Sequence, residues 1–222
     1  MAFRVYDYRK DIANLLVTPQ IRARFERIEV GQSSGVMRSR GHTHDLGHEV
    51  FLVMQGCIEF QIGDQRQVLE PGQLCVALTD EPHITRNVGD EPAVLYLSVT
   101  PHIQPTHTDW LDDETKAAPR FRPSTQYDVL QDRTISTDDL LDRHLAETRA
   151  LSEAVAVAAA AQEAQSDALR QALDEGDDDG MVSAREAMWR GLGPMFAQMY
   201  ALADAWNDLT YRTEDPDFWR PA

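Results

Sequence analysis

The chain has 222 residues and a formal net charge of −16, with 37 acidic against 21 basic side chains. Nucleic acids and anionic membranes both bind basic surfaces, so this balance argues against either as a partner. The N-terminal letters MAFRVYDYRKDI are charged throughout, and no apolar run approaches the roughly 18 residues of a membrane span. We therefore expect a cytoplasmic protein.

In chain order, residues 1–24 are expected to form an N-terminal arm. Residues 25–100 show short strand patterns separated by turn residues such as Gly63 and Pro71, which is typical of an all-β barrel. The segment 49–54 is apolar on both faces of its predicted strand, which indicates cover on both sides. The outer cover would be a second subunit, the C-terminal helices, or both.

Histidine and glutamate side chains in the barrel segment are candidate metal ligands. His42 and His44 are two residues apart, so they share a face on a strand. Glu49 has the wrong parity for the same straight strand, so residues 45–47 must turn the chain before the three side chains can converge. His48 alternates with Glu49 and is expected to point out of the barrel. Imidazole and carboxylate groups are ligands that several divalent transition metals accept.

The same residues fit the pattern H-x-H-x4-E-x6-G, which ends at Gly56. This pattern resembles the first motif of the cupin superfamily, and the likeness is closest to germin-type cupins. His83 and Asn87 resemble the second cupin motif, a histidine followed after three residues by asparagine. Where the family pattern has Pro and Gly before that histidine, this chain has Leu78 and Asp80. We therefore expect a differently shaped turn before His83.

The resemblance implies a mainly β fold, a cupin-type double-stranded β-helix or jelly-roll barrel, followed here by an α-helical hairpin. It also implies one divalent transition metal inside the barrel (Fe, Mn, Ni, Zn or Cu), with open positions for substrate oxygen, water or dioxygen. The implied metal ligands are His42, His44, Glu49 and His83. Glu49 is also the candidate catalytic residue, because a carboxylate that left the metal could carry a proton.

Residues 101–137 contain four prolines and few periodic apolar positions, which indicates a long irregular connection. We expect this connection to run along the outside of the barrel. The alternative is that its His102, His107 and Trp110 overhang the opening of the metal site.

Helical spacing of apolar residues predicts a helical hairpin over residues 138–212, with Thr137 as the first N-cap. Pro194 should kink the second helix. An aromatic stripe that includes Trp189 and Phe196 is expected to pack in the core of the hairpin. The alternative is that the helices serve assembly, and we expect a homodimer.

The turn between the two helices, residues 175–186, resembles an EF-hand loop. It has acidic groups at positions one, three and five, glycine at six, and Glu186 at twelve. Acidic residues and glycine are also common in any solvated turn between helices, so calcium binding and a plain turn both stay open.

These observations favour a metal-dependent cupin enzyme, first a dioxygenase- or oxidase-like oxidoreductase, that acts on a small oxygenated organic molecule. Isomerase or decarboxylase chemistry is the alternative within the same class. A cupin that binds or senses a small molecule without turnover is the alternative from another class. Arg38 and Arg40 are candidates for a substrate carboxylate, because guanidinium forks match carboxylates.

Overall fold

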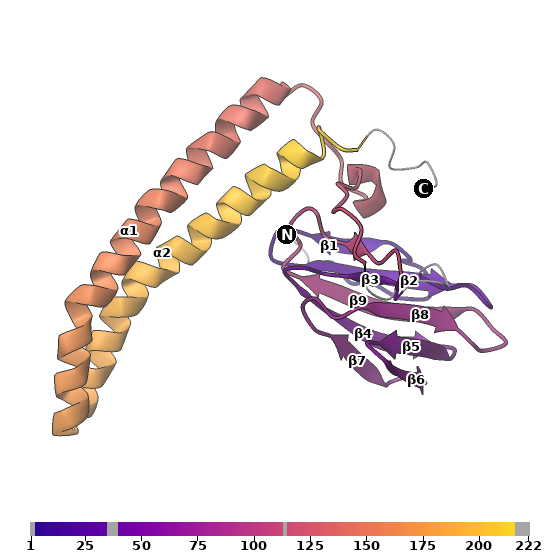
Figure 1. Ribbon diagram of the computed structural model, residues 1–222, viewed down its shortest axis with the longest axis horizontal. Coiled ribbons are helices and arrows are strands. Elements are labelled where there is room, and N and C mark those ends of the chain that lie inside the picture. Colours follow the sequence, from indigo (N-terminus) through magenta and orange to yellow (C-terminus); the bar gives the residue numbers. More distant parts are fainter. Residues whose placement is uncertain (1–2, 35–39, 113–114, 216–222) are drawn as a thin grey trace. The chain divides into compact units, whose positions relative to one another are not determined.

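The computed structural model describes residues 3–34, 40–112 and 115–215 (Figure 1). The chain divides into a β-unit, Met1–Asp132 with Thr210–Ala222, and a helical unit, Arg133–Leu209. Within the described ranges, no helix is both long and apolar enough to cross a membrane.

Ten strands formed by the described residues make two antiparallel sheets in the β-unit. The first sheet has the order β1-β2-β9-β4-β7 and the second has the order β10-β3-β8-β5-β6. The strands are β1 (Asn14–Val17), β2 (Arg22–Ile28), β3 (His42–Thr43), β4 (His48–Gln55), β5 (Ile58–Ile62), β6 (Gln65–Leu69), β7 (Leu74–Ala77), β8 (His83–Asn87), β9 (Ala93–Thr100) and β10 (Thr108–Asp109). The predicted mainly β fold of jelly-roll type is confirmed.

The core of the β-unit lies between the two sheets, because its buried apolar side chains come from both. Phe51 and Val53 on β4 and Leu95 on β9 belong to the first sheet, whereas Ile58 and Phe60 on β5 belong to the second. Strand alternation places these side chains on the inner faces, where the removal of apolar surface from water stabilises the sandwich.

The outer face of β4 is only partly covered. Val50 and Leu52 on this face are half-buried, and the neighbouring strand β7 leaves Leu74 54% and Val76 39% exposed. Val50 and Leu52 therefore form one partly exposed apolar surface with Leu74 and Val76. Cover of this face by a second subunit or by the helices stays a prediction.

The β-structure extends beyond residues 25–100 at both ends. β1 lies in the expected N-terminal arm, and β10 lies in the connection that follows β9. β10 pairs with β3 through Thr108 opposite Thr43 and Asp109 opposite His42. The connection later forms a 3₁₀ helix, η1 (Ser124–Tyr127).

The helical unit is an antiparallel pair, α1 (Thr137–Glu175) and α2 (Asp178–Thr210). The N-cap of α1 is Ser136, one residue before the expected Thr137, and its side chain accepts a hydrogen bond from the amide of Asp139. The Asp139 carboxylate in turn accepts a hydrogen bond from the Ser136 amide, which completes a capping box.

The EF-hand-like segment 175–186 does not form a calcium loop. α1 ends at Glu175 and α2 begins at Asp178, so residues 178–186 are helical. An EF-hand needs twelve residues that wrap around the ion, whereas a helix directs successive side chains away from one centre. The acidic residues here therefore belong to the end of α1, the short connection between the helices and the N-terminal end of α2.

Small side chains form the contact between the two helices. Ala158, Ala172 and Ala184 are buried, whereas Trp189 is 60% and Phe196 is 41% exposed. The expectation that the aromatic stripe fills the hairpin core is therefore wrong. Alanine lets two helices approach closely, although the ring of Trp206 on α2 lies 5.4 Å from the ring of His144 on α1, between centroids.

Gly56 occupies a position that only glycine fills without strain. Its φ is +75°, and a Cβ built there would lie 2.8 Å from both Cα and Cβ of Ala93. Gly56→Ala should cost about 1–2 kcal/mol for the left-handed backbone and a further 1–3 kcal/mol or so for overpacking. Urea denaturation measures the free energy of unfolding.

Gly31→Ala is the matched control, because Gly31 has the same φ of +75° with nothing within 4 Å of the added Cβ. It should show the backbone cost alone. Equal losses in the two variants would contradict the proposed clash with Ala93.

The homodimer stays a prediction, and the exposed rings of Trp189 and Phe196 are a surface that could form it. If the helices carry the interface, Trp189→Gln/Phe196→Gln should shift the protein to the mass of a monomer, because two large apolar contacts are lost. Light scattering after size-exclusion chromatography measures the mass. Leu130→Gln, at a 97% exposed position of the β-unit, is the control. A monomeric wild type would refute the prediction.

Candidate metal centre

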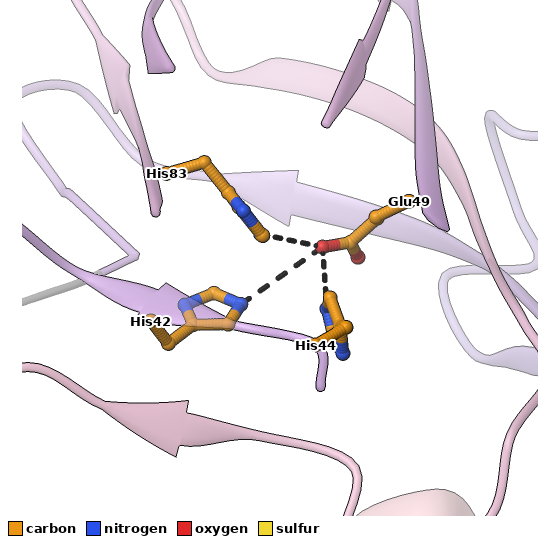
Figure 2. A group of neighbouring side chains, drawn as sticks. All are labelled: His42, His44, Glu49 and His83. Carbon is orange, nitrogen blue, oxygen red and sulfur yellow. Dashed lines mark hydrogen bonds and ion pairs between the residues drawn. The ribbon is translucent and has the colours of Figure 1, made fainter. Parts of the chain in front are cut away.

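The four ligand candidates of the sequence come together between the two sheets (Figure 2). His42 on β3 pairs directly with His83 on β8 in the second sheet, and His44 follows β3. Residues 45–47 then carry the chain across to β4 of the first sheet, where Glu49 points back at the imidazoles. The turn required by the strand parity is present.

One carboxylate oxygen lies at the centre of the cluster. Glu49 Oε2 is 2.9 Å from Nε2 of His44, 2.9 Å from Nε2 of His83 and 3.9 Å from Nε2 of His42. One ligand atom from each of the four residues lies within 4.8 Å of every other. Two ligands at right angles on one ion, each at about 2.1 Å, would be roughly 3 Å apart. The two shortest separations match this spacing.

Hydrogen bonds to backbone carbonyls determine that Nδ1 is protonated in two of the imidazoles. Nδ1 of His44 contacts the carbonyl oxygen of Thr106, and Nδ1 of His83 lies 2.9 Å from the carbonyl oxygen of Glu81. A carbonyl oxygen only accepts, so each Nδ1 carries a proton. In a neutral imidazole Nε2 then presents a lone pair, here toward the acceptor-only carboxylate of Glu49.

Such lone pairs repel the carboxylate unless a cation or an added proton lies among them. The donor set therefore fits a divalent cation, since three imidazole nitrogens and one carboxylate oxygen are ligands that transition metals accept. Metal-bound histidines commonly donate their other N–H to a carbonyl, as His44 and His83 do here.

The pKa shifts of Glu49 and His83 both favour positive charge next to the carboxylate. Burial alone would raise the pKa of Glu49, but the three neighbouring histidines outweigh it and hold that pKa well below its usual value. Burial alone would lower the pKa of His83, but the hydrogen bond and charge of Glu49 raise it. For His42, burial first and then the charge of His83 lower the pKa to about 3, so this imidazole stays neutral.

The turn before His83 accommodates the departure from the family pattern. Asp80 has a φ of +64°, the left-handed conformation that glycine adopts most easily and aspartate tolerates. Its amide donates a 2.9 Å hydrogen bond to the carbonyl of His44, and its carboxylate contacts Lys116. The turn is thus tied directly to His44, one of the four ligand candidates.

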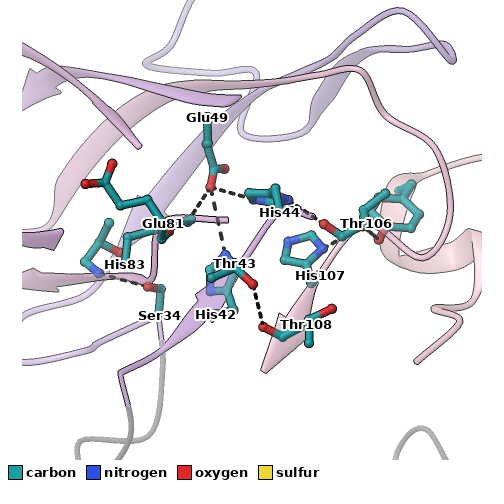
Figure 3. Close-up of polar contacts among 12 residues, drawn as sticks. Ser34, His42, Thr43, His44, Glu49, Glu81, His83, Thr106, His107 and Thr108 are labelled. Carbon is teal, nitrogen blue, oxygen red and sulfur yellow. Dashed lines mark hydrogen bonds and ion pairs between the residues drawn. The ribbon is translucent and has the colours of Figure 1, made fainter. Parts of the chain in front are cut away.

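The connection after β9 supplies a further histidine to the site (Figure 3). The pairing of β10 with β3 brings His107 to 4.8 Å from His42 and 4.5 Å from His44, between ring centroids. His107 Nδ1 lies 2.6 Å from Thr106 Oγ1. Burial first, and then the charge of Arg122, hold the pKa of His107 well below its usual value. The connection therefore does not simply follow the outside of the barrel.

Other candidates of the sequence lie elsewhere. His48 is exposed and accepts a hydrogen bond from the amide of Thr79. Arg40 forms an ion pair with Asp64. The ring of Trp110 lies against the guanidinium of Arg40, with Cζ 5.4 Å from the ring centroid. Arg38 lies outside the described residues.

A cavity of about 220 Å³ opens beside the cluster. His42, Glu49, His83 and His107 form part of its wall. Arginines that the sequence did not single out also line it: Arg22, Arg24 and Arg122. The letters RARFERI of β2 place Arg22 and Arg24 on the same face as buried Ile28, but alternating charges of this kind normally indicate a solvated face. A larger hollow of about 640 Å³ beside β6 and β7 contains none of the four ligand candidates.

Comparison with known proteins gives a family and several distant structural neighbours. Residues 24–100 match the family model described as a cupin domain. No curated protein matches the sequence. A protein with a double-stranded β-helix domain from Klebsiella pneumoniae is 18% identical over 49% of this chain and 98% of its own, with a TM-score of 0.44.

Two enzymes are among the other solved structures. A sugar phosphate isomerase of the cupin superfamily from Silicibacter pomeroyi is 23% identical over 44% of this chain and 60% of its own, with a TM-score of 0.37. An oxalate oxidase in complex with glycolate is 19% identical over 37% of this chain and 42% of its own, with a TM-score of 0.33.

The matched residues 24–100 contain both histidine motifs and seven complete strands, β3 to β9. Residues 24–100 of the β-unit thus match the cupin domain family.

Proposed function

We propose that this chain is a metal-dependent cupin enzyme that acts on a small oxygenated organic molecule. One divalent transition-metal ion would be held by three imidazoles and one carboxylate. Its proposed ligands are His42, His44, Glu49 and His83.

The observation that carries the proposal is the orientation of the imidazoles. Nδ1 of both His44 and His83 faces a backbone carbonyl, so Nε2 of each presents a lone pair to Glu49 Oε2 at 2.9 Å. A set of electron-pair donors that converge in this way is suited to a cation and poorly suited to an empty interior.

A bound transition metal would supply Lewis-acid or redox chemistry at the wall of the cavity. The chain itself would position the substrate and keep water out, since His44, Glu49 and His83 are each at most 4% exposed. His107 is neutral and lies on the cavity wall, where it can form a hydrogen bond with substrate. Glu49 is an anion among the histidines, and its catalytic role remains a prediction.

Oxidation of the dioxygenase or oxidase type is the first candidate reaction, because it suits a redox-active ion with this ligand set. Isomerase or decarboxylase chemistry would use the same ligands with the ion as a Lewis acid. A binding or sensing protein would hold the ligand at the same cavity without turnover.

Metal content tests the core of the proposal. Wild-type protein reconstituted with iron, manganese, nickel, zinc or copper should retain about one equivalent of at least one of these metals after desalting. His83→Ala should retain less than about a tenth of an equivalent, because it removes a ligand and leaves Glu49 facing fewer imidazoles. Elemental analysis measures both.

His48→Ala is the matched control, because it removes an exposed imidazole next to Glu49 in the sequence and should leave the metal content unchanged. Less than about a tenth of an equivalent of any of these metals in the wild type after reconstitution would contradict the metal-dependent function.

Oxygen uptake by the metal-loaded protein distinguishes the reaction classes. A panel of diols, keto acids and flavonols should include at least one compound that gives oxygen consumption dependent on the metal. Conversion without oxygen uptake would assign isomerase or decarboxylase chemistry instead. Binding without conversion of any compound would assign a sensing protein.

A further inference from the structure

Arg22 lies on the inner face of the first sheet, in the same row as Glu49. Both residues are register partners of Val99, Arg22 across the β2–β9 ladder and Glu49 across the β4–β9 ladder. Directly paired residues of antiparallel strands share a face, and strands are about 4.8 Å apart. The two backbones are therefore about 10 Å apart, with both side chains on the side of the cavity.

The guanidinium of Arg22 is buried and has few partners. The residue is 5% exposed. Its Nε donates a 3.1 Å hydrogen bond to Oδ1 of Asn14, and its Cζ lies 5.2 Å from the ring centroid of Tyr127. Within the described ranges Arg22 forms no ion pair, and its two terminal nitrogens make no hydrogen bond. Asp128, the nearby acid, contacts Asn14 rather than the guanidinium.

Two other charged residues of the cavity wall, Arg24 and Glu49, have counter-charges of their own. Arg24 lies 3.6 Å from Glu26, and Glu49 faces the imidazoles. Burying a charge without a partner costs several kcal/mol, and a guanidinium does not escape this cost by losing its proton. A buried arginine that lines a cavity and lacks an ion pair therefore indicates a site for an anion that is not part of the chain.

The position of Arg22 is fixed by residues that also hold the metal cluster. The Tyr127 hydroxyl lies 2.8 Å from Thr106 Oγ1, and the Thr106 carbonyl accepts the hydrogen bond from His44 Nδ1. Thr106 thus contacts both a candidate ligand imidazole and the tyrosine whose ring lies near Arg22.

We propose that the substrate is a small organic acid whose carboxylate is bound by Arg22 while another oxygen faces the histidine cluster. This assignment rests on the proposed metal-dependent function and names the substrate class of the same site. The cavity of about 220 Å³ suits a small metabolite, since drug-sized ligands need roughly 300–1,000 Å³. A carboxylate is preferred to a phosphate because Arg22 is the one buried arginine without an ion pair among the described residues of the wall, which also carries Glu26 and Asp109.

Calorimetric titration with malonate, succinate and glutarate tests the assignment, because these dicarboxylates place one carboxylate at the cluster and the other at increasing distance. The full chain is titrated metal-free and loaded with zinc, which allows binding without redox turnover. The wild type should bind at least one of the three. Arg22→Gln should weaken that binding about 10- to 100-fold, the effect of losing a charged hydrogen-bond pair.

Arg27→Gln is the matched control, because Arg27 lies on the same strand, is exposed and pairs with Glu29. It should leave affinity within about twofold of the wild type. Succinamate, which replaces one carboxylate of succinate by an amide, should bind the wild type more weakly than succinate, with little further loss in Arg22→Gln. Arg22→Lys keeps the charge near Tyr127 but loses the fork, and should weaken binding about fivefold even if Arg22→Gln fails to fold.

Three results would overturn the assignment: no dicarboxylate binds the wild type, the Arg22 variants bind as tightly as the wild type, or inorganic phosphate binds more tightly through Arg22 than any dicarboxylate. Failure of the metal-dependent function is a separate result. It would appear as absence of zinc from the wild type, whereas binding that depends on Arg22 would still be measurable on the metal-free protein.

Discussion

The β-unit is organised around one carboxylate oxygen, Glu49 Oε2, and the imidazoles that face it from the opposite sheet. The interaction depends on where the imidazole protons are. Because Nδ1 of His44 and Nδ1 of His83 donate to the carbonyls of Thr106 and Glu81, both Nε2 atoms direct lone pairs to the carboxylate when the imidazoles are neutral. Several other features follow from this constraint, including the turn between the sheets and the return of the connection onto β3.

The two sheets contribute different chemistry to the cavity. The second sheet and the connection supply imidazoles, with His42, His83 and His107 on strands or segments that pair with one another. The first sheet supplies Glu49 and Arg22, in one row on either side of Val99. A substrate between the sheets would thus meet the cluster at one point and a buried positive charge at another.

The sequence was sufficient for the parts of the site that depend on local spacing. Parity separates His48 from Glu49, and the second motif adds His83. It was insufficient where a contact depends on how distant segments pair. His107 reaches the cluster because β10 pairs with β3, and Arg22 faces inward although the alternating charges of β2 normally indicate a solvated face. In the helical unit, the aromatic pattern was an unreliable guide, because Trp189 and Phe196 are exposed whereas several alanines are buried.

Anomalous diffraction from crystals of the manganese-loaded protein tests the central claim most directly, because it locates the ion and the imidazoles together. The account predicts one peak within about 2.4 Å of Nε2 of His42, His44 and His83 and of a Glu49 carboxylate oxygen. Nδ1 of His44 and His83 should remain on the carbonyls. An ion bound elsewhere, or imidazoles that coordinate through Nδ1, would contradict it.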